Sequence, residues 1–197
     1  MKTQHFGIEI ELTGITRSKA ASLMATFFGT ERKYHEGGAY DTYIAEDGQG
    51  RKWKAMNDSS LYPEKKVGGR TVEATTNYRT EVVSPILSYE DIPKLQELVR
   101  TLRKAGAFAN KSCGIHIHVG AERFTAKTLR NLVNIMASKE DMIYRALQIN
   151  PSRESRYCRK TNTAFLKDLN RKKPVTLDGI ANLWYQEAPY GRNHHYN

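Results

Sequence analysis

Apolar and polar residues alternate strictly along residues 6–12, near the start of the chain. The polar positions are Glu9 and Glu11, and the apolar positions around them are Ile8, Ile10 and Leu12. Side chains of a β-strand point to opposite faces with a period of two residues. The pattern therefore predicts a strand that has one apolar face and two carboxylates on the other.

A second alternating segment covers residues 114–120 and is framed by glycines. Here His116 and His118 alternate with Ile115, Ile117 and Val119. Imidazole binds transition metals and hydrogen-bonds phosphates near neutral pH, and glycines allow a ligand to approach closely. If the two strands share a sheet, two carboxylates and two imidazoles converge on one surface, as in an active site built on rigid elements.

Apolar residues at helical spacing predict two helices in the first half of the chain. The first is expected from Ser18 to Phe28, stopped by Gly29. The second begins at Ser88, where an acidic residue three positions later, Asp91, forms a variant of the capping box. Its apolar side comprises Ile92, Leu95, Val99 and Leu102, and Gly106 ends it.

The second half of the chain is expected to be mainly helical after the histidine strand. Thr125 starts a helix whose inward side is predicted to be Leu129, Leu132, Val133 and Met136. Further helices are expected over residues 139–148, 161–170 and 177–185.

Turn residues divide the segment between the first two helices into short strands. Residues 40–46 and 51–56 flank the turn at 47–50, which is a hairpin signal, and residues 71–74 and 80–84 flank a turn at Asn77. The element order is then β-α-β-β-β-β-α-β-α-α. This order predicts an α+β fold with a largely antiparallel sheet and helices packed on one face.

Length and composition favour a single domain over residues 1–197. The chain is 39% apolar and 26% charged, which is enough for one sizeable core. No segment reaches the roughly 18 to 20 apolar residues that a membrane span requires. The absence of an apolar signal-peptide core, together with only two cysteines, predicts a cytoplasmic protein with reduced thiols. Cys113 and Cys158 are expected to be core residues.

Positive charge is concentrated in the second half of the chain. The net charge is +10, and residues 101–197 contain the whole excess. Such a surface favours anions such as phosphates, nucleic acid or acidic peptides, although it can also serve solubility alone. The basic residues that gather there are Arg153, Arg156, Arg159, Lys160, Lys167, Arg171, Lys172 and Lys173.

Two further acidic residues are candidates for chemistry. Glu81 is the lone acid in the apolar and small stretch of residues 80–85, and a carboxylate there is costly to bury unless it is paired or bound to a cation. Asp58 follows the predicted strand that ends at Met56, where catalytic loops tend to lie. Asp58 can equally be a turn residue.

Four motifs in order resemble those of the amidoligase family, which is similar to the glutamine synthetase and glutamate–cysteine ligase superfamily of carboxylate–amine ligases. The motifs are G-x-E-x-E, W-x-x-x-x-D-x-S, E-V-V-S-P and G-x-H-x-H-V-G, which begin at Gly7, Trp53, Glu81 and Gly114. The resemblance runs from about residue 5 to about residue 160. It implies a glutamine synthetase catalytic-domain-like fold. It also implies a form that lacks the family's C-terminal part, because a late strand of the T-x-E-F-R type is missing.

The resemblance implies an ATP-dependent ligase that activates a carboxylate as an acyl phosphate, which an amine then attacks to give an amide. Expected cofactors are ATP and Mg²⁺ or Mn²⁺, since hard cations prefer carboxylate oxygens. Predicted metal ligands are Glu9, Glu11, Glu81 and His116. His118 is placed beside His116, Asp58 binds a cation or orients the amine, and Arg156 and Arg159 contact phosphate or a substrate carboxylate.

The expected partners follow from the same reaction. They are an amine and a carboxylate, which is a small molecule or a peptide, because related proteins are associated with peptide or cell-wall modification. Superfamily relatives often complete their sites across subunits, so a homo-oligomer is one alternative, and the sequence leaves the oligomeric state open. No membrane is expected to be involved.

Two other classes of function stay open at this stage. A zinc hydrolase would use His116, His118 and one glutamate as a His₂Glu site with an open position for water. A basic nucleic-acid-binding domain on a degenerate ligase scaffold would use the charge of the second half, although no recognisable nucleic-acid motif is present.

Overall fold

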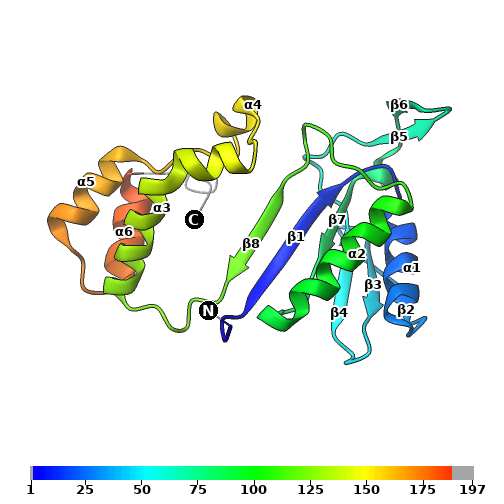
Figure 1. Cartoon of the computed structure of the whole chain (residues 1–197), viewed down its shortest axis with the longest axis horizontal. Coiled ribbons are helices and arrows are strands. Elements are labelled where there is room, and N and C mark those ends of the chain that lie inside the picture. The colour runs from blue at the N-terminus through cyan, green and yellow to red at the C-terminus, as the bar shows by residue number, and fades with distance from the viewer. Residues whose placement is uncertain (1, 188–197) are drawn as a thin grey trace. The chain divides into compact units, whose positions relative to one another are not determined.

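The computed structural model describes residues 2–187 (Figure 1). Its contacts divide the chain into two compact units, residues 1–120 (unit 1) and residues 121–197 (unit 2). The single catalytic domain expected from the composition stays a prediction. Among the described residues, no helix combines the length and the apolar character that crossing a bilayer requires.

Unit 1 is built on a six-stranded sheet with the order β2-β3-β4-β7-β1-β8, in which every neighbouring pair is antiparallel. A separate two-stranded hairpin pairs β5 with β6. With the helices, this confirms an α+β fold. The strands are β1 (Phe6–Leu12), β2 (Lys33–Gly37), β3 (Thr42–Glu46), β4 (Lys52–Met56), β5 (Glu64–Val67), β6 (Arg70–Glu73), β7 (Thr80–Val83) and β8 (Ile115–Val119).

Two helices, α1 (Arg17–Phe28) and α2 (Ile92–Lys104), contribute to one apolar core with one face of this sheet (Figure 1). The β1 residues Ile8 and Ile10 point into this core, as their alternation predicts. The opposite face, which holds the acidic residues of β1 and β7, is thereby left for chemistry. Buried members of the core include Leu12, Met24, Trp53, Val82, Leu95, Leu98 and Leu102.

The ends of the two helices test the predicted caps. The N-cap of α1 is Thr16, whose side chain accepts from the Lys19 N–H, so the start predicted at Ser18 is late. Gly29 ends α1 in the left-handed region at φ 68°, where glycine has no steric penalty. The capping box at Ser88 and Asp91 is confirmed, although it caps a short 3₁₀ turn, residues 89–91, that leads into α2.

Two strands have no sequence signal of their own. Residues 33–37 (β2) are mostly exposed on the sheet edge, and residues 64–67 (β5) form a separate two-stranded hairpin with the exposed β6. Because neither strand separates a core side from a solvent side, no apolar–polar alternation marks them.

The core of unit 1 does not cover the apolar side of β8. Ile115, Ile117 and Val119 point away from the two histidines, as period two requires, but they are 62%, 64% and 52% exposed. The core of unit 1 stops short of this strand because β8 stands at the end of the sheet.

Unit 2 is helical, with α3 (Ala126–Ala146), α4 (Pro151–Glu154), α5 (Thr163–Lys172) and α6 (Leu177–Glu187). Thr125 caps α3 as predicted, but α3 runs without a break through the two helices expected there. Leu132 lies on its exposed side, so its inward assignment is wrong. The apolar core of unit 2 contains Val133, Phe165, Leu169, Ile180, Leu183 and Trp184.

The structure shows the burial of the two cysteines and the ion pairs of the basic cluster. Cys113 and Cys158 form no disulfide among the described residues, and both are half-buried rather than the core residues that were predicted. Several of the clustered basic side chains form surface ion pairs: Lys160 with Asp141 and Glu154, and Arg171 and Lys172 with Asp168. These pairs neutralise part of the positive surface expected from composition.

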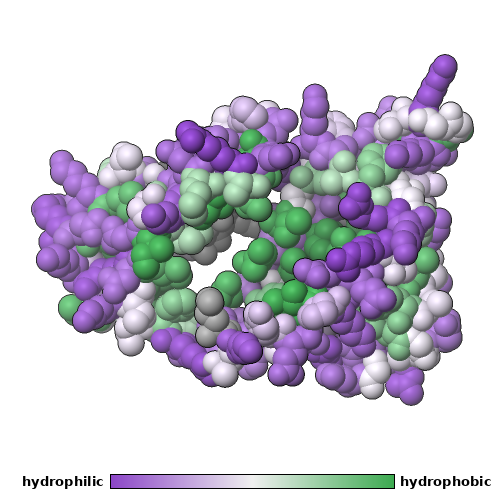
Figure 2. All heavy atoms as spheres, viewed as in Figure 1, coloured by the Kyte–Doolittle hydropathy of each residue, from purple (hydrophilic) through white to green (hydrophobic). Residues whose placement is uncertain are grey.

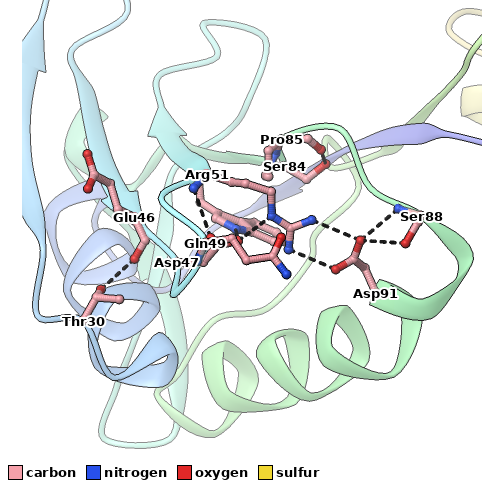
Figure 3. Close-up of polar contacts among 10 residues, drawn as sticks. Thr30, Glu46, Asp47, Gln49, Arg51, Ser84, Pro85, Ser88 and Asp91 are labelled. Carbon is pink, nitrogen blue, oxygen red and sulfur yellow. Dashed lines mark hydrogen bonds and ion pairs between the residues drawn. The ribbon is translucent and has the colours of Figure 1, made fainter.

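An ion network ties the β3–β4 hairpin to the start of α2 (Figure 3). Asp47 lies in the turn, with a side chain only 1% exposed, and accepts from Arg51 Nε at 2.8 Å and Trp53 Nε1 at 3.2 Å. The two terminal nitrogens of Arg51 donate to the two carboxylate oxygens of Asp91, at 3.1 and 2.9 Å. Arg51 lowers the pKa of Asp91 to about 2.

Candidate metal and active site

The pairing of β1 with both of its neighbours assembles the acidic face. On one side Glu11 stands opposite Glu81 of β7, and on the other Glu9 stands opposite His116 of β8. Residues directly opposite in an antiparallel pair share one face, with Cβ atoms about 5 Å apart. The two alternating strands therefore share a sheet, and three carboxylates and the imidazoles lie on its open face.

Glu9 is the centre of the histidine side of this face. Its Oε2 lies 2.9 Å from His116 Nδ1, and its Oε1 lies 3.0 Å from His118 Nε2. Both rings are more than half exposed, whereas Glu9 is half-buried. His118 thus orients the carboxylate of Glu9 from the outer side, as outer-shell groups orient ligands in metal sites.

Glu11 is the most buried acid of the group, at 5% exposed. Its Oε2 accepts from the backbone N–H of Gly114, and its Oε1 lies 3.9 Å from His116 Nε2. This contact with Gly114 anchors the start of β8 to β1 and leaves one carboxylate oxygen directed to the cluster.

Asp58 reaches the cluster from the end of β4. Met56 pairs directly with Glu81, so the chain after Met56 passes close to that carboxylate. Asp58 and Glu81 both line a cavity of about 300 Å³. The other lining residues are Ala39, Tyr40, Asn57 and Ser59. Tyr40 and Asn57 were not predicted, because neither stands at a motif position.

Within residues 2–187, two sets of three side chains have ligand atoms that all lie within 4.8 Å of one another. The first set is Glu9, Glu81 and His116, and the second is Glu11, Asp58 and Glu81. Glu81 belongs to both sets, which is the arrangement of a carboxylate that bridges two cations. His118 belongs to neither.

Burial and the neighbouring carboxylates raise the pKa of Glu81 to about 7. Burial is the largest cause, and the negative charges of Glu9, Asp58 and Glu11 add to it, while His116 acts in the opposite direction. A carboxylate surrounded by other carboxylates is costly to ionise without a compensating cation. This is the physical sign that the donor set is short of positive charge, and divalent cations would supply it.

The metal-free protein should lose stability as pH rises from about 4.5 to 7. Over this interval the folded state retains the proton of Glu81, with a pKa of about 7, while the unfolded state, at 4.5, has released it. The stabilisation is complete below the unfolded pKa and is lost as pH rises through the folded pKa. Because Glu81 is partly exposed, we expect the free energy of unfolding to fall by on the order of 1 to 2 kcal/mol over this pH interval.

Urea unfolding in EDTA at several pH values measures this loss. The variant Glu81→Gln is the control, since it has no proton to release and should show a flatter profile. An equal slope in both proteins would assign the effect to other groups.

The two predicted arginines lie in unit 2. The Arg156 guanidinium stands 5.2 Å from the centre of the Tyr157 ring, and Arg159 Nε donates to the carbonyl of Ser155. Their roles as phosphate or carboxylate contacts stay predictions, and so do the ligand roles assigned to the cluster.

Comparison with known proteins gives one match. A family described as "Putative amidoligase enzyme" matches residues 2–197, which spans both units. Neither the curated proteins nor the solved structures contain a match.

Proposed function

The chain belongs to the amidoligase family, and on this premise we propose that it is an ATP-dependent carboxylate–amine ligase that works through an acyl phosphate. The observation that supports the proposal most directly is Glu81, shared by two potential cation-binding sets on the open face of the sheet. Phosphoryl transfer from ATP needs divalent cations that hold the phosphates and neutralise their charge.

The donor set fits Mg²⁺ or Mn²⁺. Carboxylate oxygens dominate both sets, and hard cations prefer oxygen ligands, while Mn²⁺ also accepts imidazole. When bound, such cations would screen the triphosphate and orient its terminal phosphoryl group. Glu9, Glu81 and His116 would hold one ion, and Glu11, Asp58 and Glu81 the other.

The reaction has two balanced steps. A substrate carboxylate oxygen first bonds to the terminal phosphorus of ATP as the bond to ADP breaks, which gives an acyl phosphate and ADP. The amine nitrogen then bonds to the acyl carbon, phosphate leaves, and the amine gives up a proton.

The cavity beside the cluster suits the amine. Besides Asp58 and Glu81, its lining includes Tyr40 and Asn57, whose hydroxyl and amide groups can hydrogen-bond an amine. Because Asp58 would hold a cation, we assign the proton released by the amine to water in the cavity that Asp58 lines, and not to this carboxylate.

The geometry favours this reading over the zinc hydrolase. A His₂Glu zinc site needs both imidazoles and a carboxylate around one ion. In the described chain, His118 is outside both compact ligand sets. His116 Nδ1 hydrogen-bonds to one carboxylate oxygen of Glu9, and His118 Nε2 lies 3.0 Å from the other.

The test is amine-dependent release of ADP. The protein is incubated with ATP, Mg²⁺ and pools of carboxylates and amines, and ADP and the amide product are measured. Glu9→Gln should lower the rate at least about 100-fold, because the amide keeps the shape of the side chain but removes the ligand charge.

Glu97→Gln is the matched control. Glu97 is exposed on α2, so the same substitution should leave the rate within about twofold of the wild type. ADP release that needs no amine, or that survives Glu9→Gln, would contradict the proposal.

A further inference from the structure

Among residues 2–187, no strand pairs with the outer side of β8, so β8 presents an open backbone edge at one end of the sheet of unit 1. The N–H of Glu11 donates to the carbonyl of Gly114, and the N–H of Gly120 donates to that of His5. Alternate residues of an antiparallel strand turn both backbone groups to the same neighbour. The backbone groups of Ile115, Ile117 and Val119 therefore point away from β1, toward the open edge.

The same three residues expose their apolar side chains. They lie on one side of β8 because of its period of two, and each is more than half exposed. Figure 2 shows hydrophobic residues at the surface of unit 1 in the region of β8. Free backbone groups and apolar side chains thus coincide on one strand, which is the combination that recruits another strand.

The other edge of the sheet is protected in the ways that β8 is not. β2 contains Lys33 and Glu36, and its pairing with β3 is irregular between His35 and Gly37. Charged side chains and bulges on an edge oppose strand addition. β8 has no lysine, no proline and a regular register along its whole length.

The sequence of this edge strand is nearly palindromic. A strand that reads almost the same in both directions is suited to pair antiparallel with a second copy of itself. Residues 114–120 read Gly-Ile-His-Ile-His-Val-Gly, which is unchanged on reversal except for an exchange of isoleucine and valine. We propose that β8 pairs antiparallel with β8 of a second copy of this chain, about a two-fold axis through Ile117. An isologous interface requires such self-complementarity.

This register matches every position. Ile117 faces its own counterpart, Ile115 faces the partner's Val119, and the glycines face each other. Each of these outward residues exchanges two N–H···O=C bonds with the residue opposite. In a register shifted by one residue, backbone groups that already bond to β1 would face the outward-pointing groups of the partner. In a register shifted by two residues, the apolar side chains at one end of the strand would lose their counterparts.

The pairing also joins the two acidic faces. On that face His116 would lie opposite the partner's His118, at the close spacing of a pair without direct backbone bonds. Each cluster would then have an imidazole of the second copy at its rim. The inference does not depend on the ligase chemistry, so either can fail alone.

Sedimentation measures the dimer directly. Because β8 offers far fewer residues than the roughly 20 to 30 per side of a standard interface, we expect a dissociation constant of about 10 to 100 μM. Ile117→Lys places two like charges across the axis and should weaken association at least tenfold. Ile86→Lys is the control, since Ile86 is 72% exposed but lies outside β8, and it should not change the association.

Cysteine cross-linking tests the register in a background of Cys113→Ser and Cys158→Ser. Ile117→Cys should form a disulfide dimer with itself, because opposite Cα atoms lie about 5.5 Å apart. Ile115→Cys and Val119→Cys should each cross-link at least tenfold less alone but should join when mixed. A wild type that stays monomeric at about 500 μM, or equal cross-linking of all variants, would overturn the proposal.

Discussion

Replacing Glu81 with glutamine should remove both proposed cation sites in one step. Glutamine keeps the size of the side chain, but it eliminates the negative charge that the two ligand sets share. We expect each Mn²⁺ affinity to fall at least about 100-fold and amide formation to fall about 1,000-fold or more, since bound cations contribute several kcal/mol to phosphoryl transfer. Titration calorimetry and the ADP assay measure the two effects.

Two single-set variants serve as matched controls. Glu9→Gln alters only the set with His116, and Glu11→Gln alters only the set with Asp58, so each should weaken one of two binding events. Without metal, Glu81→Gln should be no less stable than the wild type near pH 7, because it removes the carboxylate that is costly to ionise. Two normal binding events in Glu81→Gln would refute the shared-ligand assignment.

Replacing Arg51 with methionine should destabilise unit 1 by about 3 kcal/mol. Methionine keeps the aliphatic length, but the buried carboxylate of Asp47 loses its ionic partner and the clamp onto Asp91 disappears. Removing one member of a buried pair typically costs about 3 to 5 kcal/mol. We expect the lower value because Asp47 still accepts from Trp53 and from the backbone N–H groups of Gln49 and Arg51. Urea unfolding gives the difference in free energy.

Arg32→Met is the control for this measurement. Arg32 also pairs with a carboxylate, Glu46, but at 3.7 Å and with a side chain that is 70% exposed. Exposed pairs contribute little, so we expect a change below about 0.5 kcal/mol. Similar losses in the two variants would show that burial of Asp47 does not set the stability of the network.

Local patterns were sufficient for most elements of the fold. The alternation along β1 and β8, the turn at residues 47–50 and the Ser88 capping box each depend on interactions within a few residues, and each is found in the structure. The start of α1 was misplaced because Thr16 and Ser18 are both good caps, and only the backbone geometry selects between them. β2 and β5 were missed because an exposed strand has no core side to mark it.

For the candidate site, the sequence by itself determined which residues share a face of each strand. Period two places Glu9 with Glu11, and His116 with His118, whatever the rest of the chain does. It also showed that Glu81 is an acid in an apolar stretch. These conclusions need only the geometry of one extended backbone.

Only the tertiary structure decided which of these faces meet. Glu9 and His116 are 107 residues apart, and the order β7-β1-β8 and its register bring them together with Glu81. The raised pKa of Glu81, the place of Asp58 in the cavity and the open edge of β8 all follow from that order. Strand order and register depend on the packing of the whole core and on the closure of long loops, and no local pattern in the chain records either one.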